Sequence, residues 1–502
     1  MIRVLGSPKR LCDGLTRRDL LHVGSLSMLG LGMSDPSSFR QASAEPATPL
    51  PVGGGFGKAK SCIFLFLYGS PSQLETFDPK PDAPEQIRGE LKSIQSNISG
   101  LDVCELLPKL STVMDKVTVI RSVSHPYPLH GVAYATTGVP RIDVALELNP
   151  KDPGQYPFIG SVVDYIDSQQ SGNARPEVPR NLLLPFPFSS QRVGEVARAG
   201  PYAGFLGQAY DPICTEFIGK ATKKATKTLA GKTWNDLEPY RGVTPDSRFQ
   251  LGGVSNLGPD LTFDRLDRRR DLLEQFEAAR REMDRGAERS GVDRHRAMAY
   301  SLLGSEKLRR AFDLDDETSQ TREMYGMTLF GQAALTARRL VEAGGRFVTA
   351  FWDEYGLAGT GWDTHWDHFP RMKDELLPGL DQTLTGLLLD LDNRGLLDET
   401  LVVCLSEHGR TPQLSLGQGG GRDHWSRCYS VLMAGGGIAR GRVVGRSDKI
   451  ASDPVERRVS PKDILATIYH LLGIDINTML TDRQGRPLAL IPDGEVVQEV
   501  IA

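Results

Sequence analysis

The sequence predicts an α/β fold with a mostly parallel central sheet, because short buried strands alternate with amphipathic helices along the chain. Leucines recur at helical spacing from Leu376 to Leu391, and Gly395 follows them as a C-terminal cap. An earlier helix is expected from about Met324 to Glu342. Four apolar runs are too short and too rich in β-branched or aromatic residues for helices, and they cover residues 62–68, 117–123, 346–352 and 400–405. Strand–helix–strand units of this kind imply helices on both faces of the sheet.

The composition is that of an ordinary globular protein. The chain has 502 residues, 39% of them hydrophobic, and a formal net charge of -4. A chain of this length can bury a large core, and nothing in its composition marks disorder. The near-neutral charge gives no electrostatic basis for a nucleic-acid partner.

The N-terminal segment has the pattern of an export signal. Arg17 and Arg18 precede an apolar run from Val23 to Met33, and the sequence Ala42-Ser43-Ala44 follows. We therefore predict a twin-arginine signal peptide over residues 1–44, recognised by the twin-arginine export machinery, and a periplasmic or extracellular mature protein. An uncleaved anchor is the less favoured alternative, because a membrane span requires ~20 apolar residues.

The mature chain is predicted to contain one large domain. Residues 45–60 are rich in Pro, Gly and Ala and are expected to form a linker, so the domain spans residues 61–502. The charged segment at about residues 234–321 is predicted to be a helical insertion in this domain. Its arginine runs are more typical of a solvated helix face than of an anion site.

Histidines and carboxylates follow the predicted strands. Ligands in open parallel sheets bind beyond the carboxyl ends of the strands, so these segments are the expected site. Six of the nine histidines lie there. The residues are Glu75 and Asp78 after the first strand, His125 and His130 after the second, Asp363, His365, Asp367 and His368 after the third, Glu407 and His408 after the fourth, and Asp423 and His424 further on.

This mixture of imidazole and carboxylate groups favours a divalent metal site. Nitrogen and oxygen donors of these types suit Zn, Mn or Fe, and they suit Ca or Mg less well. The alternative is a structural polar network without a metal. A metal that only closes the loops is a further possibility, and it would be ligated by protein groups alone with no open position.

Several sequence blocks resemble a known superfamily. The segment 387–409 has the sequence "LLLDLDNRGLLDETLVVCLSEHG", and segment 459–474 has "VSPKDILATIYHLLGI". Both resemble blocks of the alkaline phosphatase and sulfatase superfamily. More closely, "SPSQLETFDPKP", "GWDTH", "SEHGRTP" and "GRDHW" resemble the bacterial domain-of-unknown-function family fifteen-oh-one. The resemblance covers essentially the whole mature chain.

The resemblance implies an alkaline phosphatase-like α/β fold and a set of metal ligands. It places Glu407 and His408 at a metal-binding pair and His424 at a late histidine ligand. The earlier ligands would be Asp363 with His365 or His368.

Two departures from the superfamily pattern concern the first strand and the nucleophile. The first strand ends in Tyr68-Gly69 where the superfamily has an aspartate, which leaves Glu75 or Asp78 as replacements. The approach to Thr137-Gly138 lacks the expected nucleophile, although Ser122 or Ser124 could serve. No Cys-x-Pro-x-Arg motif occurs, which disfavours a standard sulfatase mechanism.

Four residues have candidate catalytic roles. A metal-activated water would need no protein nucleophile, and His125 or His130 could then act as general acid. Arg410 and Arg422 are candidate clamps for an anionic ester, or else they form salt bridges near Glu407 or Asp423.

These observations lead to two functional hypotheses. The first is a metal-dependent hydrolase of phosphate or sulfate esters. A polysaccharide is one substrate class, because four tryptophans near the site could form a sugar platform, namely Trp352, Trp362, Trp366 and Trp425. The second is a non-catalytic exported protein of the same fold that binds a glycan or a protein.

Overall fold

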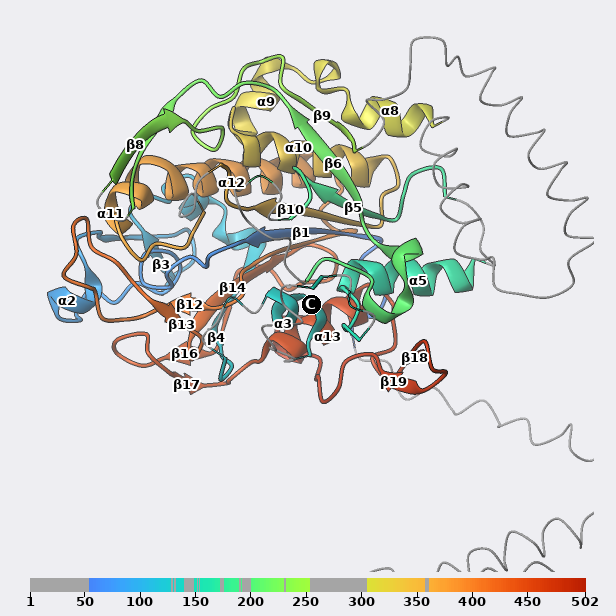
Figure 1. Cartoon of the computed structure of the whole chain (residues 1–502). Helices are drawn as coiled ribbons and strands as arrows, with labels where there is room; N and C mark the ends of the chain where they lie inside the picture. The colour runs from blue at the N-terminus through green and yellow to red at the C-terminus, as the bar shows by residue number, and fades with distance from the viewer. Residues whose placement is uncertain are drawn as a thin grey trace, which may run out of the picture. The chain divides into compact units, whose positions relative to one another are not determined.

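The computed structural model describes residues 54–127, 130, 132–139, 149–150, 152, 154–171, 176–188, 191, 200–229, 232–252, 305–356 and 361–502. The predicted signal peptide, most of the linker and residues 253–304 of the predicted insertion lie outside these ranges. Residues 53–502 form one compact unit by their internal contacts. Figure 1 shows this unit as a sheet between two layers of helices.

The centre of the unit is a nine-stranded sheet with the order β15-β4-β14-β11-β1-β10-β5-β6-β9. All four predicted strands belong to it, with ends that differ by one residue at most. The strands are β1 (Ser61–Leu67), β4 (Val117–Val123), β5 (Asn181–Leu184), β6 (Ile213–Ile218), β9 (Arg248–Leu251), β10 (Phe347–Trp352), β11 (Thr400–Leu405), β14 (Tyr429–Ala434) and β15 (Arg442–Val444).

The sheet is mostly parallel, as the sequence predicts. Strand β1 pairs in parallel with β10 and β11, and β5 pairs in parallel with β10 and β6. Strand β14 is antiparallel to both β11 and β4, and β9 is antiparallel to β6. Because β14 is antiparallel to both of its neighbours, β4 runs in the same direction as β11 and β1. The carboxyl ends of β1, β4, β10 and β11 therefore lie at the same edge.

Helices cover both faces of the sheet (Figure 1), which confirms the predicted α/β class. The longest are α5 (Ile159–Gln170), α10 (Leu329–Glu342), α12 (Leu377–Asn393) and α13 (Pro461–Leu471). Alternate residues of β1 point to opposite cores, as the pleat of a strand requires. Ile63 packs in the core with α10 and α12, whereas Phe64 packs in the core with α5 and α13.

Local sequence signals explain where these helices begin and end. Ser460 and Asp463 form a capping box at the start of α13, and Thr328 caps α10. Gly395 follows α12 with φ of 68°, the backbone that the predicted glycine cap requires. The shorter helices are α2 (Glu85–Arg88), α3 (Val132–Thr137), α8 (Glu306–Phe312), α9 (Ser319–Tyr325) and α11 (His368–Arg371), and a π-helical turn (Met372–Leu376) joins α11 to α12.

Two sequence predictions are corrected here. The helix expected from about Met324 to Glu342 is divided between α9 and α10, because Gly326 has a positive φ of 93°. The insertion expected to be helical at about 234–321 begins with strands, since β8 (Lys232–Leu237) pairs with β7 (Lys224–Leu229) and β9 pairs with β6. Cross-strand pairing decided the structure of these short segments, and helical periodicity could not anticipate it.

The remaining strands form small two-stranded hairpins. The hairpins are β2 (Ser93–Gln95) with β3 (Asp102–Cys104), β12 (Gly409–Arg410) with β13 (His424–Trp425), β16 (Arg446–Ser447) with β17 (Pro454–Glu456), and β18 (Met479–Thr481) with β19 (Pro487–Ala489).

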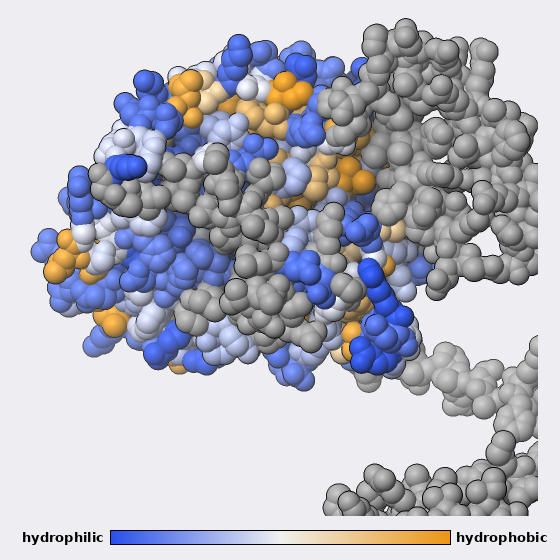
Figure 2. Space-filling model, in the orientation of Figure 1, coloured by the Kyte–Doolittle hydropathy of each residue, from blue (hydrophilic) through white to orange (hydrophobic). Residues whose placement is uncertain are grey.

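Figure 2 shows a face of the molecule that is largely hydrophilic where it is coloured. Among the described residues, no helix combines the length and apolar character that a membrane crossing requires.

Gly69 lets the end of β1 lie close to the segment that follows β10. It follows β1 with φ of +92°, and a Cβ atom there would lie 2.2 Å from the backbone nitrogen of Asp363. A real Cβ atom cannot occupy that position, so any other residue would displace the segment after β10. Glycine at position 69 is therefore a requirement of the packing and not only of the turn.

We predict that Gly69→Ala destabilises the protein far more than Gly344→Ala. Both glycines have positive φ, but a Cβ atom at Gly344 meets nothing within 4 Å. Both variants therefore carry the conformational cost, and only the first adds a steric overlap, on the order of 1–3 kcal/mol. Urea denaturation of the two variants measures this difference. Equal losses of unfolding free energy would show that the contact with Asp363 imposes no constraint.

Candidate metal centre

The loops that follow β4, β10 and β11 bring histidines and carboxylates together at one edge of the sheet. His130 comes after β4, Asp363 and His365 come after β10, and Glu407 comes directly after β11. His424 lies on β13, where it pairs with Arg410 of β12. Residues far apart in the chain thus meet where parallel strands end, which is where ligands bind in open α/β sheets.

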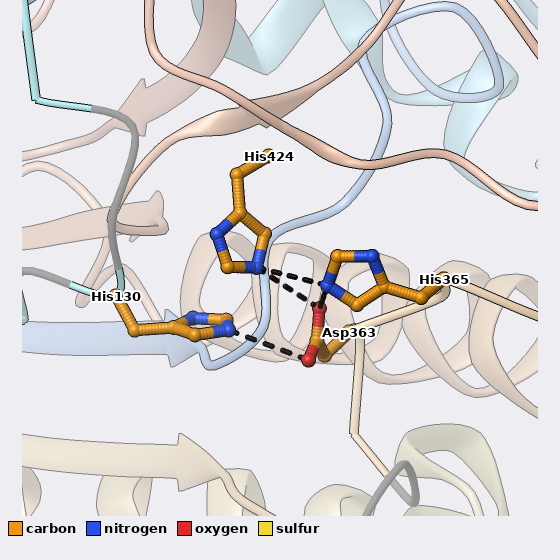
Figure 3. Close-up of side chains that lie close together, drawn as sticks. All are labelled: His130, Asp363, His365 and His424. Atoms are coloured by element: carbon orange, nitrogen blue, oxygen red, sulfur yellow. Dashed lines mark hydrogen bonds and ion pairs between the residues drawn. The ribbon is translucent and has the colours of Figure 1, made fainter. Parts of the chain in front are cut away.

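Four of these residues form what we call the aspartate group: His130, Asp363, His365 and His424. Figure 3 shows three imidazole rings directed at the Asp363 carboxylate. The Nε2 atoms of His130, His365 and His424 lie 3.3, 3.0 and 3.4 Å from its oxygens. The Nε2 atoms of His365 and His424 are also only 3.0 Å apart. One potential ligand atom from each residue lies within 4.8 Å of the others.

A second set, the glutamate group, contains His130, Glu407 and His408. His130 Nδ1 lies 2.8 Å from Glu407 Oε1, which also accepts a hydrogen bond of 2.9 Å from the backbone nitrogen of Gly69. The other carboxylate oxygen, Glu407 Oε2, and the ring atom His408 Nε2 are buried and have no hydrogen-bond partner within the part of the chain that the structure describes. Unpaired buried polar atoms are costly, so they call for a ligand at this position.

Arg410 fixes the charge and position of Asp363. Its Nη2 atom lies 2.5 Å from Asp363 Oδ1, and its guanidinium also donates to the carbonyl oxygens of Gly69, Ser70 and Arg422. Burial would raise the pKa of Asp363, but Arg410 and the hydrogen bonds from the three histidines outweigh it and hold that pKa far below its usual range. Asp363 is therefore an anion at any physiological pH.

The histidines of the site differ in protonation. Burial would lower the pKa of His130, but its hydrogen bonds to Asp363 and Glu407 prevail and raise the pKa to about 9. The hydrogen bond to Asp363 also raises the pKa of His365. Burial, and then nearby positive charge, lowers the pKa of His408, and burial also lowers the pKa of His424. Neutral imidazole is the form that binds a metal, so the last two are ready to act as ligands.

These donors fit a divalent ion in type and in spacing. The aspartate group offers three imidazoles and one carboxylate, and the glutamate group offers two imidazoles and one carboxylate with two free donor atoms. Five of the six predicted ligands, Asp363, His365, Glu407, His408 and His424, belong to these groups. His130, which the sequence suggested as a general acid, is a member of both.

The sixth predicted ligand, His368, is not part of either group. It is fully buried, its Nδ1 atom lies 2.8 Å from Thr364 Oγ1, and its Nε2 atom lies 3.3 Å from Glu75 Oε2. His368 is the first residue of α11, and there its Nε2 atom faces Glu75. Spacing along the chain could not distinguish His365 from His368, because the bend between them decides the direction of each ring.

Arg422 forms an ion pair and does not face an open site. It is 0% exposed, contacts Glu75 through two guanidinium nitrogens, and donates to the carbonyl oxygens of Ile87, Thr411 and Pro412. Arg410 is equally buried and is held by Asp363. Both arginines therefore take the salt-bridge role that was the alternative to an anion clamp, but with different partners from those expected.

The other candidate residues lie beside the groups. His125 Nε2 is hydrogen-bonded to the carbonyl oxygen of Glu407 at 2.8 Å, and burial lowers the pKa of His125 to about 4. Ser122 Oγ donates to the carbonyl oxygen of Arg457. Asp78 contacts Lys80 and Ser447. None of these side chains belongs to either group among the described residues.

Sequence reasoning missed one contact of the site and was wrong about two tryptophans. The Asp423 carboxylate is hydrogen-bonded to His365 Nδ1 at 2.7 Å and so orients that ring. The two residues lie on different loops, so the sequence alone does not reveal this contact. Two of the tryptophans proposed as a sugar platform, Trp352 and Trp362, are fully buried and pack edge to face with ring centroids 5.3 Å apart. They belong to the core, so they offer no surface to a sugar.

The family comparison agrees with the sequence resemblance. The family model described as "Protein of unknown function (DUF1501)" matches residues 59–501. The chain belongs to the DUF1501 family. None of the curated proteins matches this DUF1501 chain.

Three solved structures illustrate what the DUF1501 chain is similar to. The PsFucS1 sulfatase from Pseudoalteromonas sp. has 12% identity and a TM-score of 0.35, with 83% of this chain and 68% of that chain covered. The phosphonate monoester hydrolase SpPMH from Silicibacter pomeroyi has 10% identity and a TM-score of 0.31, with 88% and 76% covered. A mutant of the alkaline phosphatase PafA has 10% identity and a TM-score of 0.38, with 89% and 99% covered. Similarities this distant assign no activity to the chain.

We predict that Glu75→Gln strongly destabilises the DUF1501 chain. Burial would raise the pKa of Glu75, but Arg422 and His368 lower it from 4.5 to about 2. Removing one partner of a buried ion pair leaves the other charge unpaired, which costs about 3–5 kcal/mol. Because the pKa is lowered on folding, this stabilisation is complete above about pH 4.5 and is lost as the pH falls through about 2.

Urea denaturation between pH 2 and pH 7 measures this effect, with Glu456→Gln as the control. Glu456 pairs with Arg446 on the surface, where side chains are more than half exposed, so its loss should change little. A Glu75→Gln variant as stable as wild type at pH 7 would contradict the prediction.

Proposed function

We propose that this protein is a metal-dependent hydrolase of phosphate or sulfate esters, including esters carried by polysaccharides, and that it acts outside the cytoplasm. The observation that carries the proposal is the pair of buried atoms Glu407 Oε2 and His408 Nε2, which have no hydrogen-bond partner among the described residues and lie next to the aspartate group. Leaving both atoms unpaired would destabilise the fold, and a divalent cation would satisfy both.

The donor set favours a transition metal. The two groups together offer four imidazoles and two carboxylates, and imidazole is a ligand of Zn, Fe and similar ions, whereas Ca and Mg prefer oxygen. We therefore propose Zn, Mn or Fe as the ion. When bound, such an ion supplies a Lewis acid for the ester oxygen and lowers the pKa of water.

The residues around the groups position and charge the ligands. Arg410 keeps Asp363 ionised and holds it in place, and Asp423 orients His365. His125 holds the backbone of Glu407 and is neutral, so it suits a supporting role better than proton donation. His130 contacts both carboxylates, so we assign it to the ligand set and not to the general acid.

Access to the site is from the side of the aspartate group. The side chains of His365 and His424 are 29% and 19% exposed, whereas Glu407 and His408 are buried. An ester would therefore approach past these two rings. The buried Arg410 and Arg422 donate to protein acceptors, so recognition of the anionic ester falls to the exposed side of the ligand groups.

The twin-arginine pattern at Arg17-Arg18 supports the location outside the cytoplasm. Export of a folded chain is compatible with a site assembled from loops that are far apart in sequence, because such a site exists only after folding. The glycan- or protein-binding alternative shares this location and fold, and turnover distinguishes the two.

Plasma mass spectrometry of the purified mature protein, followed by a screen of phosphate and sulfate esters, tests the proposal. We expect wild type to contain a transition metal and to hydrolyse an ester, and the Glu407→Ala/His424→Ala double variant to lose both. His470→Ala is the matched control, because His470 is a largely buried histidine whose Nε2 atom bonds to the carbonyl oxygen of Gly54 at 3.0 Å and whose ring packs against Phe56, and it belongs to neither ligand group.

A protein that takes up metal but hydrolyses no ester would favour the binding alternative. A wild-type protein that contains no metal when prepared without chelator, and takes up none on titration, would contradict the hydrolase.

A further inference from the structure

His130 is placed between the two ligand groups. Its Nε2 atom lies 3.3 Å from Asp363 Oδ2, and its Nδ1 atom lies 2.8 Å from Glu407 Oε1. It is the residue common to the aspartate group and the glutamate group. Figure 3 shows one of its ring nitrogens directed at Asp363. The two nitrogens of an imidazole point away from each other, so one ring can serve two sites.

Packing on three sides fixes the orientation of this ring. The ring centroid of His130 lies 4.1 Å from that of His424, 5.3 Å from that of His408 and 5.2 Å from that of Tyr68. Its side chain is 17% exposed, and its carbonyl oxygen accepts a hydrogen bond from Val132 at the start of α3. A ring enclosed in this way cannot easily rotate to present both nitrogens to one site.

We propose that His130 is a bridging ligand that gives one nitrogen to a metal ion in the aspartate group and the other to a second ion in the glutamate group. The proposal rests on the metal-binding part of the proposed function and does not depend on turnover. A bridging imidazole carries no proton on either nitrogen, so the protons that the ions displace pass to solvent.

The two groups depend on His130 to different degrees. Without it, the aspartate group keeps the donors of Asp363, His365 and His424, whereas the glutamate group keeps only Glu407 and His408. Loss of the shared ring should therefore release the ion of the glutamate group first. The competing explanation is that His130 is a protonated cation between two carboxylates, in which case it binds no metal.

Titration of the metal-depleted mature protein with Cu²⁺ tests the bridge. Copper binds nitrogen and oxygen ligands more tightly than the other divalent ions of its row and is paramagnetic. We expect two Cu²⁺ per chain, one for each group. Because a shared imidazolate couples the two spins, the electron paramagnetic resonance signal should be weaker than the copper content measured by plasma mass spectrometry.

Three single variants refine the test. His130→Ala is expected to bind one Cu²⁺ with an uncoupled signal of full intensity, because the three other residues of the aspartate group remain. His365→Ala keeps the bridging ring and should weaken only the aspartate group. His470→Ala should behave as wild type. Circular dichroism checks that each variant is folded, and the wild-type signal decides the question if His130→Ala is not.

Several outcomes overturn the bridge. Wild type that binds one ion or none, two ions with uncoupled signals, or a folded His130→Ala variant that still binds two coupled ions would each do so. One ion together with ester hydrolysis refutes the bridge and leaves the proposed function standing. Two coupled ions without hydrolysis support the bridge and refute the hydrolase.

Discussion

The site depends on the backbone of Gly69, where the end of β1 meets the loops after β10 and β11. Its nitrogen donates to Glu407, and its carbonyl oxygen accepts from Arg410, which in turn pairs with Asp363. One residue without a side chain therefore links both ligand groups. The space that a Cβ atom would fill is occupied by the backbone of Asp363, so no residue with a side chain could be accommodated at position 69 without moving a proposed ligand.

Buried charges around the site are neutralised in pairs. Arg410 balances Asp363, and Arg422 balances Glu75. A buried charge is tolerated only when it is paired and hydrogen-bonded, and both guanidinium groups also donate to several backbone carbonyls. The arginines thus fix the loops that carry the ligands, and they remain committed to protein partners.

Two buried atoms of the glutamate group are not satisfied by this network. Among the described residues, Glu407 Oε2 and His408 Nε2 have no hydrogen-bond partner, whereas the other polar atoms of the same side chains, Glu407 Oε1 and His408 Nδ1, are hydrogen-bonded. Both atoms belong to the glutamate group, which makes them candidate ligand atoms. The site therefore has two faces: Glu407, which contacts His130, is buried, and the side chain of His365 is partly open to solvent.

The sequence by itself determined the α/β class, the main strands and most of the proposed ligands. Buried strands and amphipathic helices leave local periodic signals, and the rule that ligands gather beyond parallel strand ends located Asp363, Glu407 and His424. Only the tertiary structure decided which histidines converge. His365 and His368 are three residues apart, yet the start of α11 turns one toward Asp363 and the other toward Glu75. Such directions depend on contacts between distant segments, which no local pattern records.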